Sequence, residues 1–382
     1  MRVGVDALYA VPQGGGGTWT YLHALMQELP RCDPTHEYVV FANREGAGQF
    51  ASASGAVSMV ACPVTAQPPA ARLAYEYSVL PVQLCRHGID VVFAPSFTLP
   101  ASPVRASVVT IHDMRHEDLP QTFPAAYGAV LRRLTRDAAR RATCVLTDSW
   151  HARTRILACY NLPPDRVYVT PLAVDPAYFT RASGDERARV AATYGVRAPY
   201  VFSVARPSWQ KNLAVLVDAF IALRKLGGAP LQLVLTGWRR PEEAPELWAK
   251  LRAAGLDDAV RLLGWVPDND LPILYQSATV HVVPARYEGF GLPVLEAMAS
   301  EAPVIASSAT SLPEVAGGAA LHFAPDDCTA LVAALRHVTN DAVLRARLIA
   351  RGKIQARRFT WRNTAEITLT ALERAVYEKR RA

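Results

Sequence analysis

The feature that most constrains the fold is a regular alternation of short apolar runs with amphipathic helical stretches. Six strand-like runs lie in the first half of the chain and six in the second: "RVGVDAL", "EYVVFA", "DVVFAP", "SVVTIH", "CVLTDS", "RVYVTP", "YVFSVA", "LQLVLTG", "AVRLLG", "TVHVVPA", "PVIAS" and "AALHF". Such alternation is typical of βαβ units, which build parallel sheets. Two sets in one chain predict an α/β protein with two Rossmann-like, doubly wound domains.

The domain boundaries follow from the stretch 176–198, which lacks strand character and separates the two sets. We expect an N-terminal domain at 1–175, a C-terminal domain at 199–358 and a closing helix at 359–382 that can cross back to the N-terminal domain. The closing helix would be capped by Thr360 or Asn363, and its expected buried residues are Ile367, Leu369, Leu372 and Val376.

Composition excludes several classes of protein. Of the 382 residues 51% are apolar and 20% charged, as in folded domains rather than disordered chains. The six cysteines form no C-x-x-C pair, so neither a zinc site nor a disulfide framework is indicated, and a reducing cytosol fits best. Met1-Arg2 runs directly into an apolar strand, so we expect no secretory signal. The longest uncharged run, 46–71, reads as loop and short strand.

Two stretches of the chain are rich in basic residues and are candidates for binding anions. Residues 351–382 hold nine basic and three acidic side chains and contribute most of the net charge of +7. The stretch 127–146 has helically spaced apolar residues and carries Arg132, Arg133, Arg136, Arg140 and Arg141. Either stretch suits an anionic membrane or a lipid diphosphate, and either also suits the solvated side of a helix.

Ligands of an open parallel sheet bind beyond the carboxyl ends of its strands, so residues that follow strands are candidates for a site. After the first strand come Gly14 to Gly17, whose amides can face an anion, and Thr18, which can cap the next helix. The pattern is neither G-x-G-x-x-G nor a P-loop, so a glycine loop without a ligand is an equal alternative. His112 also follows a strand, and taken alone it fits a structural histidine better than a catalytic one.

Arg206 and Lys211 flank a short turn after "YVFSVA", and we expect a helix to begin near Lys211 or Asn212. Two cations beside a helix N-terminus suit a diphosphate. Two surface cations without a ligand are the alternative.

The stretch "RYEGFGLPVLEAMA", 286–299, follows the strand "TVHVVPA". Gly289 and Gly291 allow a sharp turn and a close approach of backbone to ligand, and Pro293 suits the first turn of a helix. Glu288 precedes this corner and Glu296 follows it, so the two carboxylates can reach different parts of one ligand. A dipole partner in the first turn of a helix explains Glu296 but not Glu288.

The sequence "DND", Asp268 to Asp270, matches the D-x-D pattern of metal–nucleotide sites. It also precedes a helical run, so we expect Asp268 to cap that helix and Asp270 to be a first-turn acid.

In their order and spacing these motifs resemble those of the retaining glycosyltransferases of family four, which have the GT-B fold of two Rossmann-like domains facing a central cleft. The resemblance covers nearly the whole chain. It is most specific at "EGFGLPVLEAMA", which fits the E-x7-E signature, and "ARPSWQKNL", "VTIHD", "VTPLAVDPAYF" and "SLPEVAGGAALHFAPDD" support it. In particular, the chain resembles bacterial mannosyltransferases of surface-polysaccharide assembly.

The resemblance implies roles for the matching residues, of which His112, Glu288, Arg206 and Lys211 would be catalytic. Glu288 would hold hydroxyls of the donor sugar, and Glu296 would bind the ribose. Arg206 and Lys211 would neutralise the diphosphate, and His112 would face the sugar from the other domain. Backbone contacts would come from Val266 to the base, from Phe290, Gly291 and Leu292 to phosphate and sugar, and from Gly15 and Gly16 to phosphate or acceptor.

The resemblance also implies a metal-independent transfer, without a cofactor, that retains the anomeric configuration. GDP-mannose is the favoured donor, and the acceptor is a saccharide or a lipid-linked saccharide. We expect no nucleic-acid partner, a cytoplasmic location, and contact with an anionic membrane at the inner face of the plasma membrane as a further possibility. A nucleotide-sugar epimerase of GT-B architecture and a non-catalytic nucleotide-binding protein are the alternatives.

Overall fold

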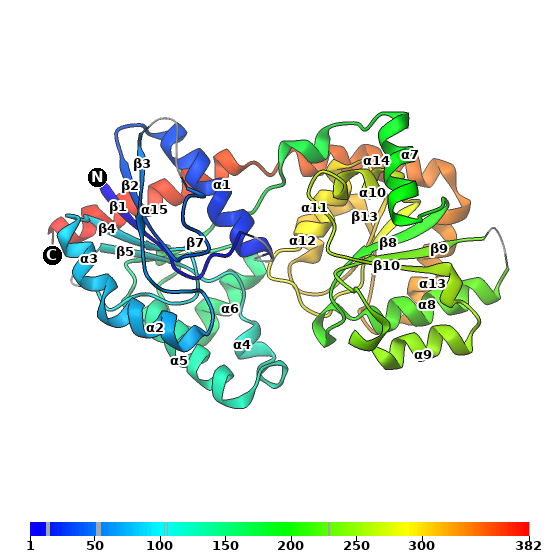
Figure 1. Ribbon diagram of the computed structural model, residues 1–382, viewed down its shortest axis with the longest axis horizontal. Helices are drawn as coiled ribbons and strands as arrows, with labels where there is room; N and C mark the ends of the chain where they lie inside the picture. Colours follow the sequence, from blue (N-terminus) through cyan, green and yellow to red (C-terminus); the bar gives the residue numbers. More distant parts are fainter. Residues whose placement is uncertain (13–15, 51–54, 103, 105, 228–229, 382) are drawn as a thin grey trace. The chain divides into compact units, whose positions relative to one another are not determined.

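The structure, a computed structural model, describes residues 1–12, 16–50, 55–102, 104, 106–227 and 230–381 (Figure 1). The chain forms two compact units, residues 1–172 with 360–382, and residues 173–359. Each unit is built on one parallel sheet, which confirms the α/β class. The stretch 176–198 belongs to the second unit, because its helix α7 (Gly184–Tyr194) packs against α10 (Leu271–Ser277).

The first unit holds a seven-stranded sheet in the order β3-β2-β1-β4-β5-β6-β7. All six apolar runs expected here form strands, and the short strand expected within 46–71 is β3. The strands are β1 (Arg2–Ala7), β2 (Glu37–Ala42), β3 (Val57–Ala61), β4 (Val91–Ala94), β5 (Ala106–Thr110), β6 (Cys144–Thr147) and β7 (Val167–Val169). Their pairings are parallel, and most strand residues are buried, which explains the nearly continuous apolar runs.

Helices connect these strands. They are α1 (Gly16–Cys32), α2 (Pro69–Ser78), α3 (Leu80–Arg86), α4 (Arg115–Asp118), α5 (Ala125–Arg141) and α6 (Trp150–Tyr160), with 3-10 turns η1 (Pro120–Thr122) and η2 (Pro164–Arg166). Because α1 begins at Gly16, Thr18 lies inside the helix and the expectation that it caps the helix is wrong.

The second unit holds a six-stranded sheet in the order β10-β9-β8-β11-β12-β13, and its pairings are parallel. All six runs expected in this half form its strands. These are β8 (Tyr200–Val204), β9 (Gln232–Thr236), β10 (Val260–Gly264), β11 (Val280–Val283), β12 (Val304–Ser307) and β13 (Ala320–Phe323).

The remaining helices of the second unit alternate with its strands. They are α8 (Leu213–Lys225), α9 (Pro245–Ala253), α11 (Leu292–Ala299), α12 (Leu312–Ala316), α13 (Cys328–Asn340) and α14 (Ala342–Ala356). The 3-10 turns are η3 (Pro176–Phe179), η4 (Trp209–Lys211), η5 (Pro241–Glu243), η6 (Asp257–Ala259) and η7 (Gly317–Ala319).

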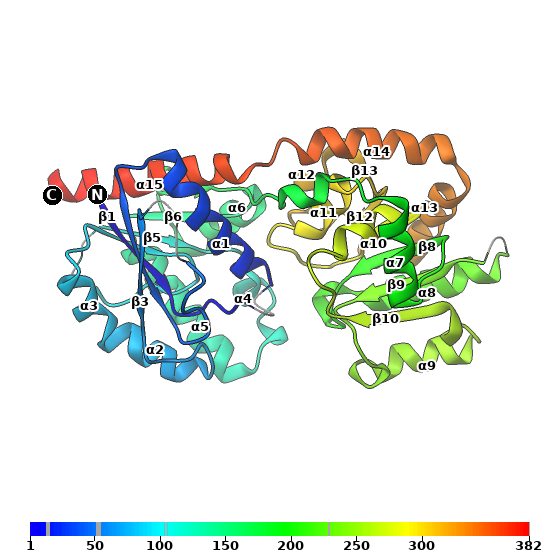
Figure 2. The ribbon, with the colours of Figure 1, turned by 45° about the horizontal axis from the view of Figure 1, so that its top comes forward.

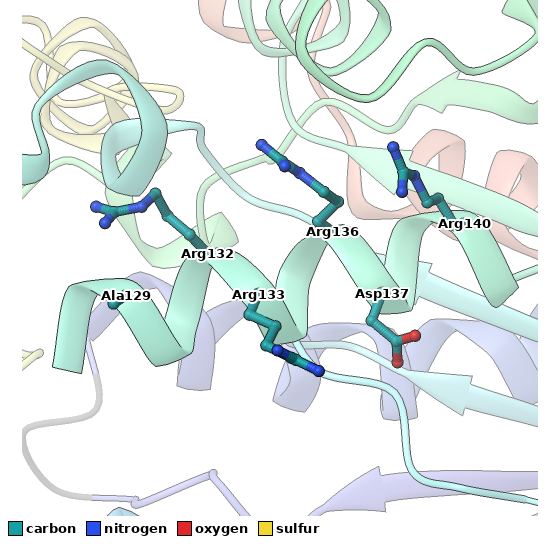
Figure 3. A pocket seen from close by; sticks show the side chains of 6 residues that line it. All are labelled: Ala129, Arg132, Arg133, Arg136, Asp137 and Arg140. Atoms are coloured by element: carbon teal, nitrogen blue, oxygen red, sulfur yellow. The ribbon is translucent and has the colours of Figure 1, made fainter. Parts of the chain in front are cut away.

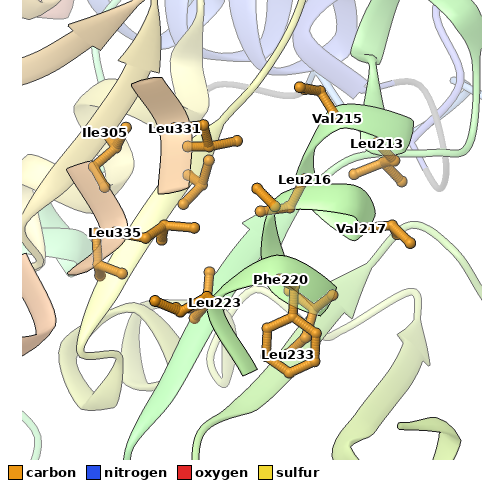
Figure 4. Packing of buried hydrophobic residues seen from close by; sticks show 14 of the residues in the cluster. Leu213, Val215, Leu216, Val217, Phe220, Leu223, Leu233, Ile305, Leu331 and Leu335 are labelled. Atoms are coloured by element: carbon orange, nitrogen blue, oxygen red, sulfur yellow. The ribbon is translucent and has the colours of Figure 1, made fainter. Parts of the chain in front are cut away.

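The core of the second unit fixes the position of α8, the helix that follows η4. Figure 4 shows Leu216 and Leu223 of α8 on the side of Leu331 and Leu335 of α13, while Phe220 points toward Leu233 of β9. These side chains are nearly completely buried. Burying a leucine or phenylalanine contributes about 1.5–3 kcal/mol, so this contact anchors the loop between β8 and α8.

The last helix, α15 (Trp361–Arg381), belongs to the first unit and packs against α1 and the sheet (Figures 1 and 2). Thr360 caps it, since its Oγ1 accepts a 3.2 Å hydrogen bond from the Asn363 amide. Of the four residues expected to be buried, only Leu372 is fully buried. The buried face instead consists mainly of small side chains, namely Thr364, Ala365, Thr368, Ala371 and Ala375, which allow α15 to approach its neighbours closely.

Candidate functional site

Three loops meet at one edge of the second sheet. They follow β8, β11 and β12, which are neighbours because β11 pairs with both β8 and β12. The carboxyl ends of parallel strands lie at the same edge, where open α/β sheets bind ligands. The candidate donor residues Arg206, Lys211, Glu288 and Glu296 all lie in or just beyond these loops.

The loop after β8 ends in a tight turn rather than directly in a helix. Lys211 is the last residue of η4, Asn212 has a left-handed backbone (φ 53°), and α8 begins at Leu213. Asn212 is buried, and its side-chain amide donates a 2.6 Å hydrogen bond to the carbonyl of Pro325. The Arg206 side chain is exposed and forms no ion pair within the described part of the chain, so its charge is available to a ligand.

Arg286 joins the loop after β11 to its neighbours. Its amide donates a 2.8 Å hydrogen bond to the carbonyl of Gln210, and its guanidinium lies 4.9 Å from the ring centre of Trp209. The same guanidinium forms a 2.7 Å ion pair with Asp326, which follows β13. The loops at this edge are therefore connected by side chains as well as by the sheet.

The corner between β11 and α11 requires glycine at one position. Gly291 has a φ of 104°, and a Cβ atom there would lie 2.6 Å from Leu312 Cδ2. At Gly291 the turn therefore depends on the backbone freedom of glycine, as expected. Helix α11 begins at Leu292 with Pro293 in its first turn, as expected.

Lys211 and Glu288 bind one another. Lys211 Nζ lies 2.5 Å from Glu288 Oε1, and the side chains are 29% and 12% exposed. A partly buried charge-assisted hydrogen bond of this length fixes both groups at the entrance of the corner. The sequence predicted separate roles for these residues and did not predict their contact.

Thr310 and Ser311, which the sequence reasoning missed, hold the backbone of the corner. Thr310 Oγ1 accepts from the Glu288 amide at 3.0 Å and donates to the Glu288 carbonyl at 2.9 Å. The buried Ser311 hydroxyl lies 2.9 Å from the carbonyl of Glu288 and 2.8 Å from that of Phe290. Thr310 has a φ of 49°, which is unusual for a β-branched residue and typical of strained positions in functional sites.

Glu296 is held by a tyrosine. The buried Tyr275 phenol donates a 2.8 Å hydrogen bond to Glu296 Oε2. The pKa of Glu296 is raised from 4.5 to about 7, mainly by burial. The Tyr275 hydrogen bond and the Lys211 charge oppose this rise, and the Asp268 carboxylate adds to it. Glu296 therefore changes charge near neutral pH.

The acids of the "DND" sequence do not cap α10. Asp270 is the residue before the helix, but its side chain accepts no hydrogen bond from the first turn. Instead its carboxylate binds Arg189 at 2.6 Å and Tyr194 at 2.8 Å, both from α7. The expectation that Asp268 caps the helix is wrong, because α10 begins at Leu271 and Asp270 is the residue before it. Asp270 therefore precedes the first turn instead of lying in it. Val266, the expected base contact, is buried beside the exposed Trp265.

In the first unit, His112 follows β5 and is fully hydrogen-bonded. Its Nδ1 lies 2.9 Å from Asp148 Oδ2, and its Nε2 lies 3.2 Å from the carbonyl of Pro95. Both partners can only accept, so both ring nitrogens donate, as in an imidazolium. Burial lowers the pKa of His112, but the charge and hydrogen bond of Asp148 outweigh it and raise the pKa above its usual value. Gly16 opens α1 with a φ of 58°, and Gly15 lies outside the described residues.

A second buried polar group in the first unit was not predicted. Glu76 forms a 2.6 Å ion pair with Arg72 and accepts from Thr98 at 3.2 Å. Burial, reinforced by the nearby charge of Glu76, raises the pKa of Asp6 at the carboxyl end of β1 well above its usual value. The sequence signal is Asp6 itself, a carboxylate inside an otherwise apolar strand.

Two family models match the chain, "Glycosyltransferase Family 4" over residues 15–178 and "Glycosyl transferases group 1" over residues 186–355. The O-antigen chain mannosyltransferase B of Escherichia coli is 34% identical over 278 residues, which are 72% of this chain and 72% of that protein. The chain belongs to glycosyltransferase family 4. The predicted family is therefore confirmed.

Other similarities agree with this glycosyltransferase assignment. The MMP alpha-(1->4)-mannosyltransferase of Mycolicibacterium hassiacum is 32% identical over 65% of the chain, and the match spans 58% of that protein. The crystal structure of WaaG, a glycosyltransferase involved in lipopolysaccharide biosynthesis, superimposes with a TM-score of 0.74 at 18% identity, covering 95% of this chain and 97% of that one. This likeness confirms the GT-B fold.

Outside the donor region, the glycosyltransferase has an arginine-lined hollow on α5. It has a volume of about 390 Å³ and is lined by Ala129, Arg132, Arg133, Arg136, Asp137 and Arg140. Figure 3 shows Arg132, Arg136 and Arg140 on one side of the helix, and Arg133 and Asp137 on another. On the same helix Val130 is 51% exposed, and Arg141 is held by Asp137 and by backbone carbonyls. Among the described residues, no helix is long and apolar enough to cross a bilayer.

Proposed function

We propose that this glycosyltransferase transfers mannose from GDP-mannose to a saccharide or lipid-linked saccharide acceptor, with retention of the anomeric configuration. The mannosyltransferase names of its relatives support the choice of sugar. The observation that most supports this position of the donor site is the contact between Lys211 and Glu288 beside the start of α11. It gathers a cation, a carboxylate and free backbone amides at one corner.

The proposed binding mode divides the donor among these groups. Arg206, Lys211 and the amides near Phe290, Gly291 and Leu292 receive the diphosphate, while Glu288 accepts sugar hydroxyls. Glu296 accepts the ribose hydroxyls, and the backbone near Val266 contacts the base. On binding, the diphosphate competes with Glu288 for Lys211, so Glu288 becomes available to the sugar.

The proposed mechanism follows from charge. When the glycosyl bond breaks, the departing diphosphate gains negative charge, which Arg206, Lys211 and the α11 N-terminus stabilise without a metal or cofactor. The leaving phosphate accepts the proton of the acceptor hydroxyl on the same face of the sugar, which gives retention. We keep His112 as a proposed contact of the transferred sugar and the Gly15–Gly16 region as a proposed contact of phosphate or acceptor.

The acceptor side includes a membrane in this proposal. The arginine-lined hollow on α5 suits lipid phosphates, so we place the glycosyltransferase in the cytoplasm, in peripheral contact with the inner face of the plasma membrane. The relatives do not favour the epimerase or the non-catalytic alternative.

Transfer from labelled nucleotide sugars tests this function. Purified full-length protein is incubated with GDP-mannose, UDP-glucose or UDP-galactose and a panel of lipid-linked saccharides, with and without a chelator. We expect mannosylated product from GDP-mannose, unchanged by the chelator, and an α linkage by NMR. Turnover of the donor to an epimer without acceptor would contradict the proposal, as would product from UDP-sugars only.

A further inference from the structure

Three potential metal ligands meet at the amino-terminal edge of the first sheet. Asp33 and His36 lie between α1 and β2, and Glu373 lies on α15. One potential ligand atom of each residue lies within 4.8 Å of those of the other two. Because β2 begins at Glu37, this cluster lies at the end of the sheet opposite to the carboxyl ends of the strands.

The spacing of the three atoms matches a metal site better than hydrogen bonding. His36 Nε2 lies 3.6 Å from Asp33 Oδ2 and 3.6 Å from Glu373 Oε1, which is too long for a hydrogen bond. Ligands about 2.0–2.1 Å from a tetrahedral zinc ion are separated from each other by roughly 3.4 Å. The two separations are therefore close to the edges of a zinc tetrahedron.

Two buried polar atoms at this cluster lack hydrogen-bond partners. They are His36 Nε2 and the hydroxyl of Tyr38. Tyr38 is completely buried and follows His36 by two residues. Buried polar groups without a partner are rare in proteins. His36 Nε2 would coordinate a cation, and a water molecule bound to that cation would give the Tyr38 hydroxyl a hydrogen-bond partner.

The other side of the imidazole favours the tautomer that a metal requires. The Thr35 hydroxyl donates a 2.6 Å hydrogen bond to Asp33 Oδ1, so towards His36 Nδ1, at 3.2 Å, it can only accept. The Met1 amino group can only donate, but it lies farther from Nδ1, at 3.5 Å, the outer limit of a hydrogen bond. The shorter Thr35 contact favours a proton on Nδ1, which leaves the Nε2 lone pair for a metal. Metal-bound histidines are commonly held in this way by a partner of the second nitrogen.

We propose that Asp33, His36 and Glu373 bind one zinc ion, which ties α15 to the corner between α1 and β2. An imidazole and two carboxylates suit zinc, whereas calcium and magnesium prefer oxygen ligands alone. Water completes the tetrahedron. The proposed ion has a structural role and takes no part in the transfer reaction. It lies at the edge of the first sheet opposite to the strand ends that carry candidate site residues, so it is compatible with a metal-independent transfer.

Zinc titration of the full-length protein tests this proposal. After treatment with a chelator and dialysis, calorimetry with zinc chloride is expected to show one ion per chain, and zinc should raise the melting temperature. His36→Ala should lose more than about tenfold in zinc affinity and most of the rise in melting temperature. If that variant does not fold, Glu373→Gln provides the same comparison, since Glu373 is half exposed.

His337→Ala is the matched control. His337 Nε2 also lies 3.6 Å from a carboxylate, Asp341 Oδ2, but both side chains are exposed and no third ligand is present among the described residues. Its zinc binding should equal that of the unmodified protein. Absence of zinc binding, equal binding by His36→Ala, or equal binding of magnesium would overturn the proposal.

Discussion

Lys211 and Glu288, 77 residues apart in the chain, form a 2.5 Å ion pair between the loops that follow β8 and β11. The contact holds together two side chains that we propose bind the nucleotide sugar. In the proposed binding mode, the diphosphate replaces Glu288 as the partner of Lys211, and Glu288 then accepts hydroxyls of the sugar.

The pair should contribute to the stability of the protein. Lys211→Met leaves the mostly buried Glu288 carboxylate without its cation and should lower the free energy of unfolding by about 1–3 kcal/mol. Adding Glu288→Gln should restore part of this loss, which denaturant unfolding of both variants measures. The matched control is Lys250→Met, whose partner Asp218 is exposed, and it should change stability by less than about 1 kcal/mol. Equal losses for Lys211→Met and Lys250→Met would contradict the argument.

Nucleotide binding should depend on the charge of Glu296. Above a pH of about 7 the ionised carboxylate accepts ribose hydroxyls, and below it the protonated group accepts less well. The ratio of the GDP dissociation constants of Glu296→Gln and the unmodified protein should therefore rise with pH through about 7. Tyr275→Phe removes a hydrogen bond that lowers this pKa, so the midpoint should move to higher pH. A ratio that does not vary with pH would contradict the assignment of Glu296.

The same carboxyl gives a prediction for stability. Its pKa in the folded protein is above the unfolded value of 4.5, so its contribution is most favourable below that value and is lost as pH rises through about 7. Glu296→Gln should therefore raise the melting temperature at a pH of about 8 and change it little at a pH of about 5. A stabilisation that is equal at both pH values would speak against a titrating Glu296.

Gly291→Ala should disrupt the corner. The new Cβ meets Leu312 at 2.6 Å, and the φ of 104° is unfavourable for any residue except glycine. We expect a loss of about 1–3 kcal/mol in the free energy of unfolding together with weaker nucleotide binding. Gly184→Ala is the control, since it lies at the start of α7 with nothing within 4 Å, and it should be neutral or slightly stabilising. Normal nucleotide affinity in Gly291→Ala would show that the corner does not form the site.

Thr310 should act through its hydroxyl. Thr310→Val removes both hydrogen bonds to the Glu288 backbone and should cost about 1–3 kcal/mol in stability and raise the KM for the donor. Thr310→Ser keeps the hydroxyl and should retain nearly normal KM. If Thr310→Ser is as impaired as Thr310→Val, the methyl group rather than the hydrogen bonds is responsible.

The α5 arginines should bind anionic lipid. Replacing Arg132, Arg136 and Arg140 by glutamine should weaken the free energy of binding to vesicles that contain phosphatidylglycerol by about 1 kcal/mol per arginine. Co-sedimentation with the vesicles measures this loss. The comparison is replacement of Lys379, Arg380 and Arg381 at the end of α15, which should have a smaller effect. If the second variant loses more binding, the basic C-terminus is the membrane contact.

The sequence predicted the elements of the fold well because parallel strands buried on both faces leave clear apolar runs. It predicted less about the contacts between elements. Thr310 and Ser311 hold a corner that lies some twenty residues earlier in the chain, and this depends on the pairing of β11 with β12. For Tyr275 the sequence indicates only a buried position in α10. Its hydrogen bond to Glu296 depends on how α10 packs against α11.

Competition between roles explains the predictions that failed. The sequence predicts Asp270 in the first turn of α10, but Asp270 lies just before the helix, and its carboxylate binds Arg189 and Tyr194 of α7. On α15 Ile367, Leu369 and Val376 are only partly buried, because small residues form most of the packed face.

Calorimetric titration of the full-length protein with GDP tests the central claim most directly. The account predicts one site, about 10–100-fold weaker binding by Lys211→Met, and unchanged binding by Lys250→Met. Equal affinity of all three proteins for GDP would contradict a donor site at the Lys211–Glu288 corner.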